Sequence, residues 1–246
     1  MSLEITGMGR EKMRKIGLIG GMSWESTAIY YRLINEEVRS RLGGLHSAKL
    51  LLWSFDFAEI AERQHADDWA GATDMMVEAA RTLEQADAEA LVICTNTMHR
   101  MADDIQARVS VPLIHIADAT AEAMKAADVS RPILLATRFT MEQDFYKGRL
   151  ADRYGIAATV PDEAGRDSVH RIIYEELVRG VVKPESKAAY LREVARLRST
   201  SEGRDVDGLI MGCTEITMLV GKGDFDIPVF DTTAIHAAAA VDFALS

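Results

Sequence analysis

Two cysteines, the only ones in the chain, each stand where an apolar segment gives way to polar residues. Cys94 follows the segment 91–93, and Cys213 follows the segment 209–212. Ligands of parallel α/β sheets bind beyond the carboxyl ends of the strands, and a helix N-terminus there raises the thiolate fraction of a cysteine. We therefore expect the two loops to face each other across one substrate, with an acid/base group on each wall.

Acid/base groups on opposite walls suit a reaction that inverts a carbon centre. One group removes a proton from the carbon, and the other returns a proton to the opposite face. An α-amino acid has such a carbon beside a carboxylate, which free backbone N–H groups at helix N-termini can hold. Because the α-proton is only weakly acidic, preset hydrogen bonds must also stabilise the charge that develops.

The loops after four expected strands supply a small, hydroxyl-rich and mostly uncharged set of candidate site residues. In chain order these are Met22, Ser23, Cys94, Thr95, Asn96, Thr97, Thr137, Thr140, Cys213, Thr214 and Glu215. Each loop also precedes an expected helix N-terminus, where free N–H groups favour anions. The set therefore suits a carboxylate ligand.

Structural roles compete with these assignments. A single cysteine after an apolar segment is most often a small buried hydrophobe, and only the matching contexts of the two favour a function. The glycines at 17, 20 and 21 lack the G-x-G-x-x-G spacing of a dinucleotide site and indicate a tight strand–helix turn. His99 stands among core methionines, so we expect it to be structural or to hydrogen-bond a site residue.

Composition excludes several classes of function. The 246 residues carry a formal net charge of -10, which argues against nucleic acid or an anionic membrane as the main partner. Two cysteines form no disulfide framework and, without clustered histidines, no structural zinc site. No apolar segment is long enough to span a bilayer. Residues 1–13 lack the apolar region of a signal peptide, so we expect a disordered extension there and a cytoplasmic protein.

Strand-like apolar segments alternate with segments of helical periodicity, which predicts an α/β fold of parallel sheets flanked by helices. The expected strands are 15–20, 49–53, 90–93, 113–116, 133–136, 157–160, 208–211 and 228–230. The expected helices include 69–87, 98–109, 119–127, 167–179, 184–197 and 233–245.

The second half of the chain weakly repeats the first. The loop at Cys94 resembles the loop at Cys213, and the segment 112–120 resembles the segment 228–235. This repeat predicts two similar α/β lobes with the site in the cleft between them. The expected lobes are 14–115 together with 231–246, and 116–230.

Five short motifs carry a resemblance to a known family. They are Gly20–Thr27 (GGMSWEST), Thr95–His99 (TNTMH), Thr137–Thr140 (TRFT), His170–Leu177 (HRIIYEEL) and Gly212–Glu215 (GCTE). In these motifs the chain resembles the aspartate/glutamate racemase superfamily, which includes hydantoin racemases. The resemblance implies two pseudo-symmetric α/β domains, a facing pair of cysteines, a small amino-acid substrate, a homodimer, and neither cofactor nor metal.

The sequence departs from the family at one position. The family pattern in the first site loop is Cys-Asn-Thr-x-His, and the match from Asn96 to His99 sets Thr95 at the cysteine position. The internal repeat gives the same register, with Thr95 opposite Cys213. Neighbouring side chains of an extended segment point to opposite faces, so Cys94 and Thr95 should not both reach the cleft. We expect Thr95 to face the site, with Cys94 as the alternative.

A threonine hydroxyl is a far weaker base than a thiolate, which makes the two walls unequal. We expect Cys213 to remove the α-proton of one enantiomer efficiently, while Thr95 relays or donates a proton on the other face. This arrangement resembles the L-specific subgroup of the family. It implies interconversion of L- and D-aspartate or glutamate by two-base proton transfer, with faster reaction of the L-substrates.

The resemblance also implies roles in substrate binding. Met22, Asn96, Thr97, Thr140 and Thr214 are implied to hold the α-carboxylate and α-amino group. Arg171 is the candidate for a side-chain carboxylate, although ordinary pairing with Glu175 on one helix explains it equally well. Three alternatives stay open: a hydantoin racemase, an isomerase or decarboxylase of small dicarboxylates, and a non-catalytic amino-acid binder.

Overall fold

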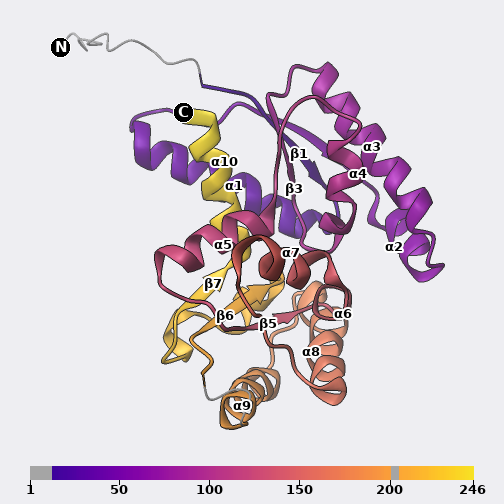
Figure 1. Ribbon diagram of the computed structural model, residues 1–246. Helices are drawn as coiled ribbons and strands as arrows, with labels where there is room; N and C mark the ends of the chain where they lie inside the picture. Colours follow the sequence, from indigo (N-terminus) through magenta and orange to yellow (C-terminus); the bar gives the residue numbers. More distant parts are fainter. Residues whose placement is uncertain (1–12, 201–204) are drawn as a thin grey trace.

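The computed structural model describes residues 13–200 and 205–246, and two parallel sheets lie one above the other in Figure 1. Their strands are β1 (Ile16–Gly20), β2 (Leu50–Ser54), β3 (Ala90–Ile93), β4 (Leu113–Ile114), β5 (Pro132–Ala136), β6 (Gly208–Gly212) and β7 (Val229–Asp231). The first sheet has the order β2-β1-β3-β4, and the second has the order β5-β6-β7. The predicted fold class, parallel sheets flanked by helices, is confirmed.

Helices alternate with these strands along the chain. The α-helices are α1 (Trp24–Leu42), α2 (Phe57–His65), α3 (Trp69–Gln85), α4 (Ala102–Gln106), α5 (Ile116–Ala126), α6 (Arg138–Glu142), α7 (Asp144–Tyr154), α8 (Glu163–Glu175), α9 (Pro184–Ser199) and α10 (Thr232–Leu245). Short 3₁₀ helices are η1 (Thr97–Met101), η2 (Leu177–Arg179), η3 (Thr214–Met218) and η4 (Lys222–Asp224).

Several elements differ from expectation: α2 was not predicted, and the predicted helix 98–109 is divided into η1 and α4. The predicted strand 157–160 is reduced to a single bridge between Thr159 and Ile133. The predicted helix 167–179 begins earlier, because the Asp162 side chain caps the N-terminus of α8 by accepting a backbone hydrogen bond. It also ends earlier, at Glu175, and is followed by η2.

The first sheet is covered on both faces, and the side chains of β3 alternate between the two cores. Leu91 and Ile93 pack with α3, whereas Val92 and Cys94 pack with α1 and α10. Cys94 continues the strand, because its N–H donates to the Ile19 carbonyl oxygen at 2.9 Å. Because side chains of a strand alternate between its faces, Cys94 points into the core and the next side chain, Thr95, points away from it.

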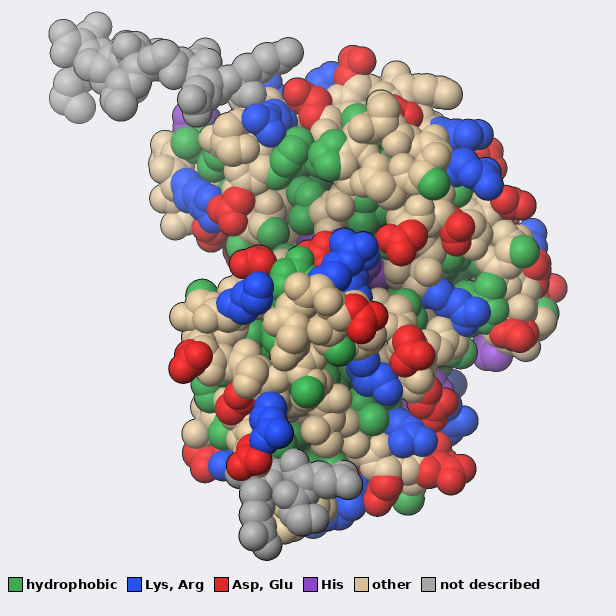
Figure 2. Space-filling model, viewed as in Figure 1, with side chains coloured by type: hydrophobic (Ala, Val, Ile, Leu, Met, Phe, Trp, Pro, Cys, Tyr) green, Lys and Arg blue, Asp and Glu red, His purple; other side chains and the backbone are tan. Residues whose placement is uncertain are grey.

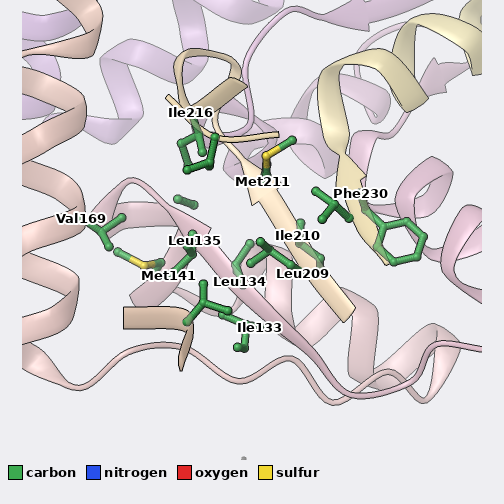
Figure 3. Close-up of a cluster of buried hydrophobic side chains, with 14 of the residues drawn as sticks. Ile133, Leu134, Leu135, Met141, Val169, Leu209, Ile210, Met211, Ile216 and Phe230 are labelled. Carbon is green, nitrogen blue, oxygen red and sulfur yellow. The ribbon is translucent and has the colours of Figure 1, made fainter. Parts of the chain in front are cut away.

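The second sheet packs against α5 to α9 in a core of its own. Figure 3 shows Leu135 of β5, Met141 of α6 and Val169 of α8 meeting beside this sheet. All three are at most 2% exposed. Each buried side chain of this size contributes roughly 1.5–3 kcal/mol, so the core anchors α6 and α8 firmly beside the strand ends.

The C-terminal helix α10 returns to the first sheet and packs against both α1 and α5. His236 Nε2 donates to the Ile114 carbonyl oxygen at 2.7 Å, because that oxygen can only accept. Nδ1 of the same ring then accepts from the Tyr30 hydroxyl at 2.8 Å. These bonds join α10 to α1 and β4. The division into lobes 14–115 with 231–246, and 116–230, stays a prediction.

Acidic and basic side chains are interspersed over the face shown in Figure 2. Within residues 13–200 and 205–246, every helix is too short or too polar to cross a membrane. The predicted extension 1–13 lies outside the described residues except for Met13, which packs against the core of the first sheet.

Gly21, directly after β1, has a conformation and surroundings that favour glycine. Its φ is +85°, and a Cβ would lie 2.4 Å from the backbone nitrogen and oxygen of Phe55. We expect Gly21→Ala to lower the free energy of unfolding by about 3 kcal/mol, from left-handed strain plus the clash. Gly43 is the control: its φ is +72°, but a Cβ there would have no atom within 4 Å. We expect Gly43→Ala to lower the free energy of unfolding by about 1 kcal/mol, from backbone strain without a clash. Urea denaturation measures both, and equal losses would contradict the close approach to Phe55.

Candidate active site

One pocket collects the strand-end loops of both sheets. Its volume is about 590 Å³ when the open solvent at its mouth is included. It is lined by Met22, Ser23, Ser26, Phe57, Gln64, Thr95, Asn96, Thr97, Met98, Thr137, Ile173, Tyr174, Val178, Gly212, Cys213, Thr214 and Glu215. Nine of these come from the candidate set drawn from the sequence, because the carboxyl ends of parallel strands converge at one edge of each sheet.

Cys213 follows β6 directly, and its thiol is partly exposed to the pocket. The Sγ–H donates to Oε2 of Glu215 at 2.9 Å. Burial and the nearby carboxylate of Glu215 raise the pKa of the Cys213 thiol well above its usual range. The thiol is therefore protonated at neutral pH, with its proton already directed at an acceptor.

The Glu215 carboxylate is held from the opposite lobe by the start of α1. Oε1 accepts hydrogen bonds from Ser26 Oγ at 2.9 Å and from Ser23 Oγ at 3.3 Å. Ser23 is also the N-cap of α1, a helix whose N-terminal dipole favours a negative charge nearby. Glu215, predicted as a substrate ligand, thus contacts Cys213 and two serines.

Thr95 and Cys94 occupy opposite sides of the same chain segment. Thr95 is partly exposed and lines the pocket, whereas Cys94 is 0% exposed and lies in the core with α1 and α10. Burial raises the pKa of the Cys94 thiol, so this sulfur behaves as a small apolar group. The structure therefore brings Thr95, and not Cys94, to the pocket that holds Cys213.

His99 fixes the backbone of Thr95. The Ile116 N–H donates to His99 Nε2 at 3.2 Å, so the proton of the neutral ring sits on Nδ1. Nδ1 then donates to the Thr95 carbonyl oxygen at 2.8 Å. Burial, and after it the neighbouring His115, lower the pKa of His99 well below its usual range, which keeps this tautomer neutral.

Asn96 presents an unpaired acceptor. Its Nδ2 donates to Thr232 Oγ1 at 3.1 Å, and that hydroxyl donates to the Met211 carbonyl oxygen at 3.0 Å. Its Oδ1 is buried and has no partner among the described residues. A buried acceptor without a donor costs free energy, so Oδ1 suits a ligand that brings an N–H group.

Three threonine hydroxyls form a buried triangle beside Asn96. The Oγ1 atoms of Thr97 and Thr137 are 3.2 Å apart, those of Thr137 and Thr140 3.3 Å, and those of Thr97 and Thr140 3.5 Å. Thr97 and Thr137 line the pocket, and Thr140 is buried behind them. On the opposite side, Thr214 Oγ1 is hydrogen-bonded to Thr233 Oγ1 at 2.8 Å. Hydroxyls that can each donate or accept suit a carboxylate.

Arg171 lies apart from this pocket. Its side chain is 52% exposed and is 3.8 Å from Glu175 and 3.6 Å from Glu176. It lies on α8, whose Ile173 and Tyr174 do line the pocket. The sequence placed Arg171 on the correct helix, but the rotation of α8 turns its guanidinium away from the site.

Several pocket residues were missed by sequence reasoning. They are Ser26, Phe57, Gln64, Met98, Ile173, Tyr174, Val178 and Gly212. Ser26 had a usable signal, because it stands three residues after the N-cap Ser23 and therefore on the first turn of α1. The residues of α2 and α8 had none, since their periodicity marks only which side chains are apolar.

A sequence model of the Asp/Glu/Hydantoin racemase family matches residues 19–240. The chain belongs to this family. An Asp/Glu racemase candidate from Yersinia pestis is 53% identical, with a TM-score of 0.89 over 95% of this chain and 100% of that one. An aspartate racemase homologue from Pyrococcus horikoshii OT3 is 35% identical, with a TM-score of 0.83 over the same shares. RacX of Bacillus subtilis, a broad specificity amino-acid racemase, is 19% identical over 232 residues, 92% of this chain and 96% of RacX.

Membership of the racemase family agrees with the geometry of the pocket. The predicted resemblance is confirmed, and with it the assignment to amino-acid racemases at the level of the family. The racemase fold also places the two loops of the internal repeat, at Thr95 and Cys213, in one pocket.

Proposed function

We propose that this protein is an amino-acid racemase that moves the α-proton between two faces of its substrate with groups of its own chain. The observation that carries the proposal is that Cys213, with its proton acceptor Glu215, and Thr95 line one pocket. Aspartate and glutamate stay the predicted substrates on family resemblance. The α-carbon chemistry is the same for any α-amino acid.

The reaction begins at the thiol. Glu215 Oε2 takes the proton of Cys213 Sγ across their 2.9 Å hydrogen bond, which leaves a thiolate. The two serine hydroxyls on Oε1 stay in place and hold the carboxyl group during this transfer. The thiolate then removes the α-proton, and the α-carbon is left as a carbanion that needs a proton from either face.

Binding of the amino acid orients its α-carbon between the two walls. Oδ1 of Asn96 accepts a hydrogen bond from the α-ammonium group, which gives this buried atom its missing partner. The hydroxyls of Thr97, Thr137 and Thr214 donate to the α-carboxylate, where negative charge accumulates as the proton leaves. Polar groups already fixed by mutual hydrogen bonds need little reorganisation during this step.

The two walls differ in chemistry, which underlies the proposed preference for L-substrates. Cys213 serves the L-enantiomer. On the other face the Thr95 hydroxyl relays a proton from solvent at the open pocket to the carbanion, and Glu215 afterwards releases the thiol proton to solvent. Because the equilibrium constant of a racemisation is one, kcat/KM must be equal in both directions. The difference between the walls therefore appears in the exchange of the α-proton with solvent without inversion. The thiol of Cys213 exchanges the α-proton of the L-enantiomer readily, whereas the hydroxyl of Thr95 exchanges that of the D-enantiomer slowly.

Deuterium exchange tests the proposal directly. The protein is incubated in D₂O with single L- or D-amino acids, NMR follows the Cα–H signal, and chiral chromatography follows inversion. We expect deuterium at Cα of both enantiomers, with exchange into the starting enantiomer faster for L than for D. A non-catalytic binder would show ligand binding with no deuterium at Cα of any amino acid tested, and equal retention exchange for L and D would refute the unequal walls.

Substitutions at Thr95 separate exchange from inversion. Thr95→Val keeps the shape but removes the hydroxyl, so we expect inversion to fall about 100-fold while retention exchange of the L-substrate persists. Thr95→Ser should keep inversion within about threefold, because it keeps the hydroxyl. Thr95→Cys should speed retention exchange of the D-substrate. Normal inversion by Thr95→Val would show that Thr95 delivers no proton.

Two further expectations stay predictions: a homodimer, on the resemblance, and a cytoplasmic protein, on composition.

A further inference from the structure

We infer that four side chains outside the pocket form a clasp between the two sheets, and that this clasp sets the spacing of the hydroxyls proposed to bind the α-carboxylate. The clasp consists of Trp69, Arg100, Phe139 and Gln143. None of the four lines the pocket, so they act as positioning residues. The inference rests on the proposed function and extends it to side chains that touch no substrate.

The hydroxyls that the clasp positions come from both sheets. Thr97 begins η1, which follows β3 of the first sheet, whereas Thr137 and Thr140 follow β5 of the second sheet. These three hydroxyls form a cradle, in which Thr97 meets the other two at 3.2 Å and 3.5 Å. Hydrogen bonds between neutral hydroxyls are weak, so the width of the cradle depends on the other contacts that join η1 to α6.

One such contact lies a single turn away from the cradle. Arg100 stands three residues after Thr97 on η1, and its Nη1 donates to Gln143 Oε1 at 2.9 Å. Gln143 is the C-cap of α6, the five-residue helix that carries Thr140. Because a charged donor makes a stronger hydrogen bond than a neutral one, this contact fixes the end of α6 against η1.

Trp69, at the start of α3, supplies the other half of the clasp. The Arg100 guanidinium lies over its ring, 4.1 Å from the centroid, which is cation–π geometry. The ring also meets Phe139 of α6 edge to face, with centroids 5.6 Å apart and planes at 76°. Phe139 lies between Thr137 and Thr140 in the chain, so a shift of its ring moves the backbone that carries both hydroxyls.

The core of the second sheet holds α6 from the other side. Arg138 Nη2 donates to Asp167 Oδ1 of α8 at 2.5 Å, and the Arg138 N–H donates to His170 Nδ1 at 3.3 Å. The rings of Phe139 and His170 also meet edge to face, with centroids 6.4 Å apart. The helix α6 is therefore fixed to α8, and the clasp sets its distance from η1 of the first sheet.

Arg100→Ala tests the clasp, because Arg100 is exposed and its loss leaves the core intact. We expect the dissociation constant for L-glutamate, measured by calorimetry, to rise at least about tenfold and kcat/KM to fall as much. Inversion and both retention exchanges should fall by the same factor, since one cradle serves both faces of the α-carbon. The matched control is Arg14→Ala, which removes a guanidinium 4.6 Å from the Phe243 ring, outside the pocket lining, and should change neither quantity.

A double-mutant cycle separates positioning from a structural role. Thr97→Val removes one hydroxyl of the cradle, so in that background Arg100→Ala should lower kcat/KM by less than about threefold. Trp69→Phe keeps an aromatic face for Arg100 and Phe139, and it should retain at least about half of the wild-type kcat/KM. Independent, multiplicative losses from Arg100→Ala and Thr97→Val would overturn the inference, and so would an unchanged dissociation constant in Arg100→Ala.

The clasp and the proposed function fail separately. Absence of α-proton exchange by the wild-type protein with every amino acid tested would overturn the racemase function. The clasp is then judged by the same cycle on dissociation constants, which depend on the cradle and require no turnover. A wild-type protein that neither exchanges the α-proton nor binds any of the amino acids would overturn both.

Discussion

Replacing Cys213 with serine is expected to lower α-proton exchange at least about 1,000-fold for L-substrates. A serine hydroxyl keeps its proton far more tightly than a thiol, so Glu215 can no longer generate a base from the side chain at 213. Because serine preserves the volume and the hydrogen bond to Glu215, binding of the amino acid should persist. NMR in D₂O measures the exchange, and saturation-transfer NMR with L-glutamate measures the binding.

Cys94→Ala is the matched control, since it removes the second thiol from the core of the first sheet. It should leave exchange unchanged and lower the free energy of unfolding by about 1 kcal/mol through lost packing. Retained exchange in Cys213→Ser would refute the role of the thiol. Loss of exchange in a folded Cys94→Ala variant would restore Cys94 as the alternative base.

Glu215→Gln is expected to lower exchange about 100-fold at pH 7, because the thiol of Cys213 loses its proton acceptor. The pH profile should change as well. Burial keeps the thiol protonated at neutral pH, so without Glu215 the active thiolate must form by loss of a proton to solvent. The rate of the variant should then rise by about tenfold per pH unit between about pH 7 and pH 9, and more steeply than the wild-type rate.

Glu176→Gln is a suitable control for this variant. Glu176 is also a buried carboxylate and accepts from Ser186 Oγ at 2.5 Å, but it does not line the pocket. Its replacement should lower stability and leave the pH profile of exchange unchanged. A Glu215→Gln protein with the wild-type rate and slope would mean that Cys213 is deprotonated by another route.

Much of this protein is encoded in local patterns of its sequence. Alternating apolar segments predict parallel strands, which place Thr95 and Cys213 each at the carboxyl edge of its own sheet. The choice between Thr95 and Cys94 also follows from a local rule, because successive side chains of an extended segment point to opposite faces. The sequence therefore determined the fold class and most of the polar residues that line the pocket.

Tertiary structure decided which distant groups meet. Ser26 and Glu215 are 189 residues apart in the chain, and no local period relates the start of α1 to the loop after β6. Arg171 shows the converse, since its position on α8 was predicted and its direction was not. The rotation of a helix about its axis is set by its packing against neighbouring elements. Side-chain periodicity fixes the faces of single elements, whereas the docking of two lobes fixes which faces enclose the substrate.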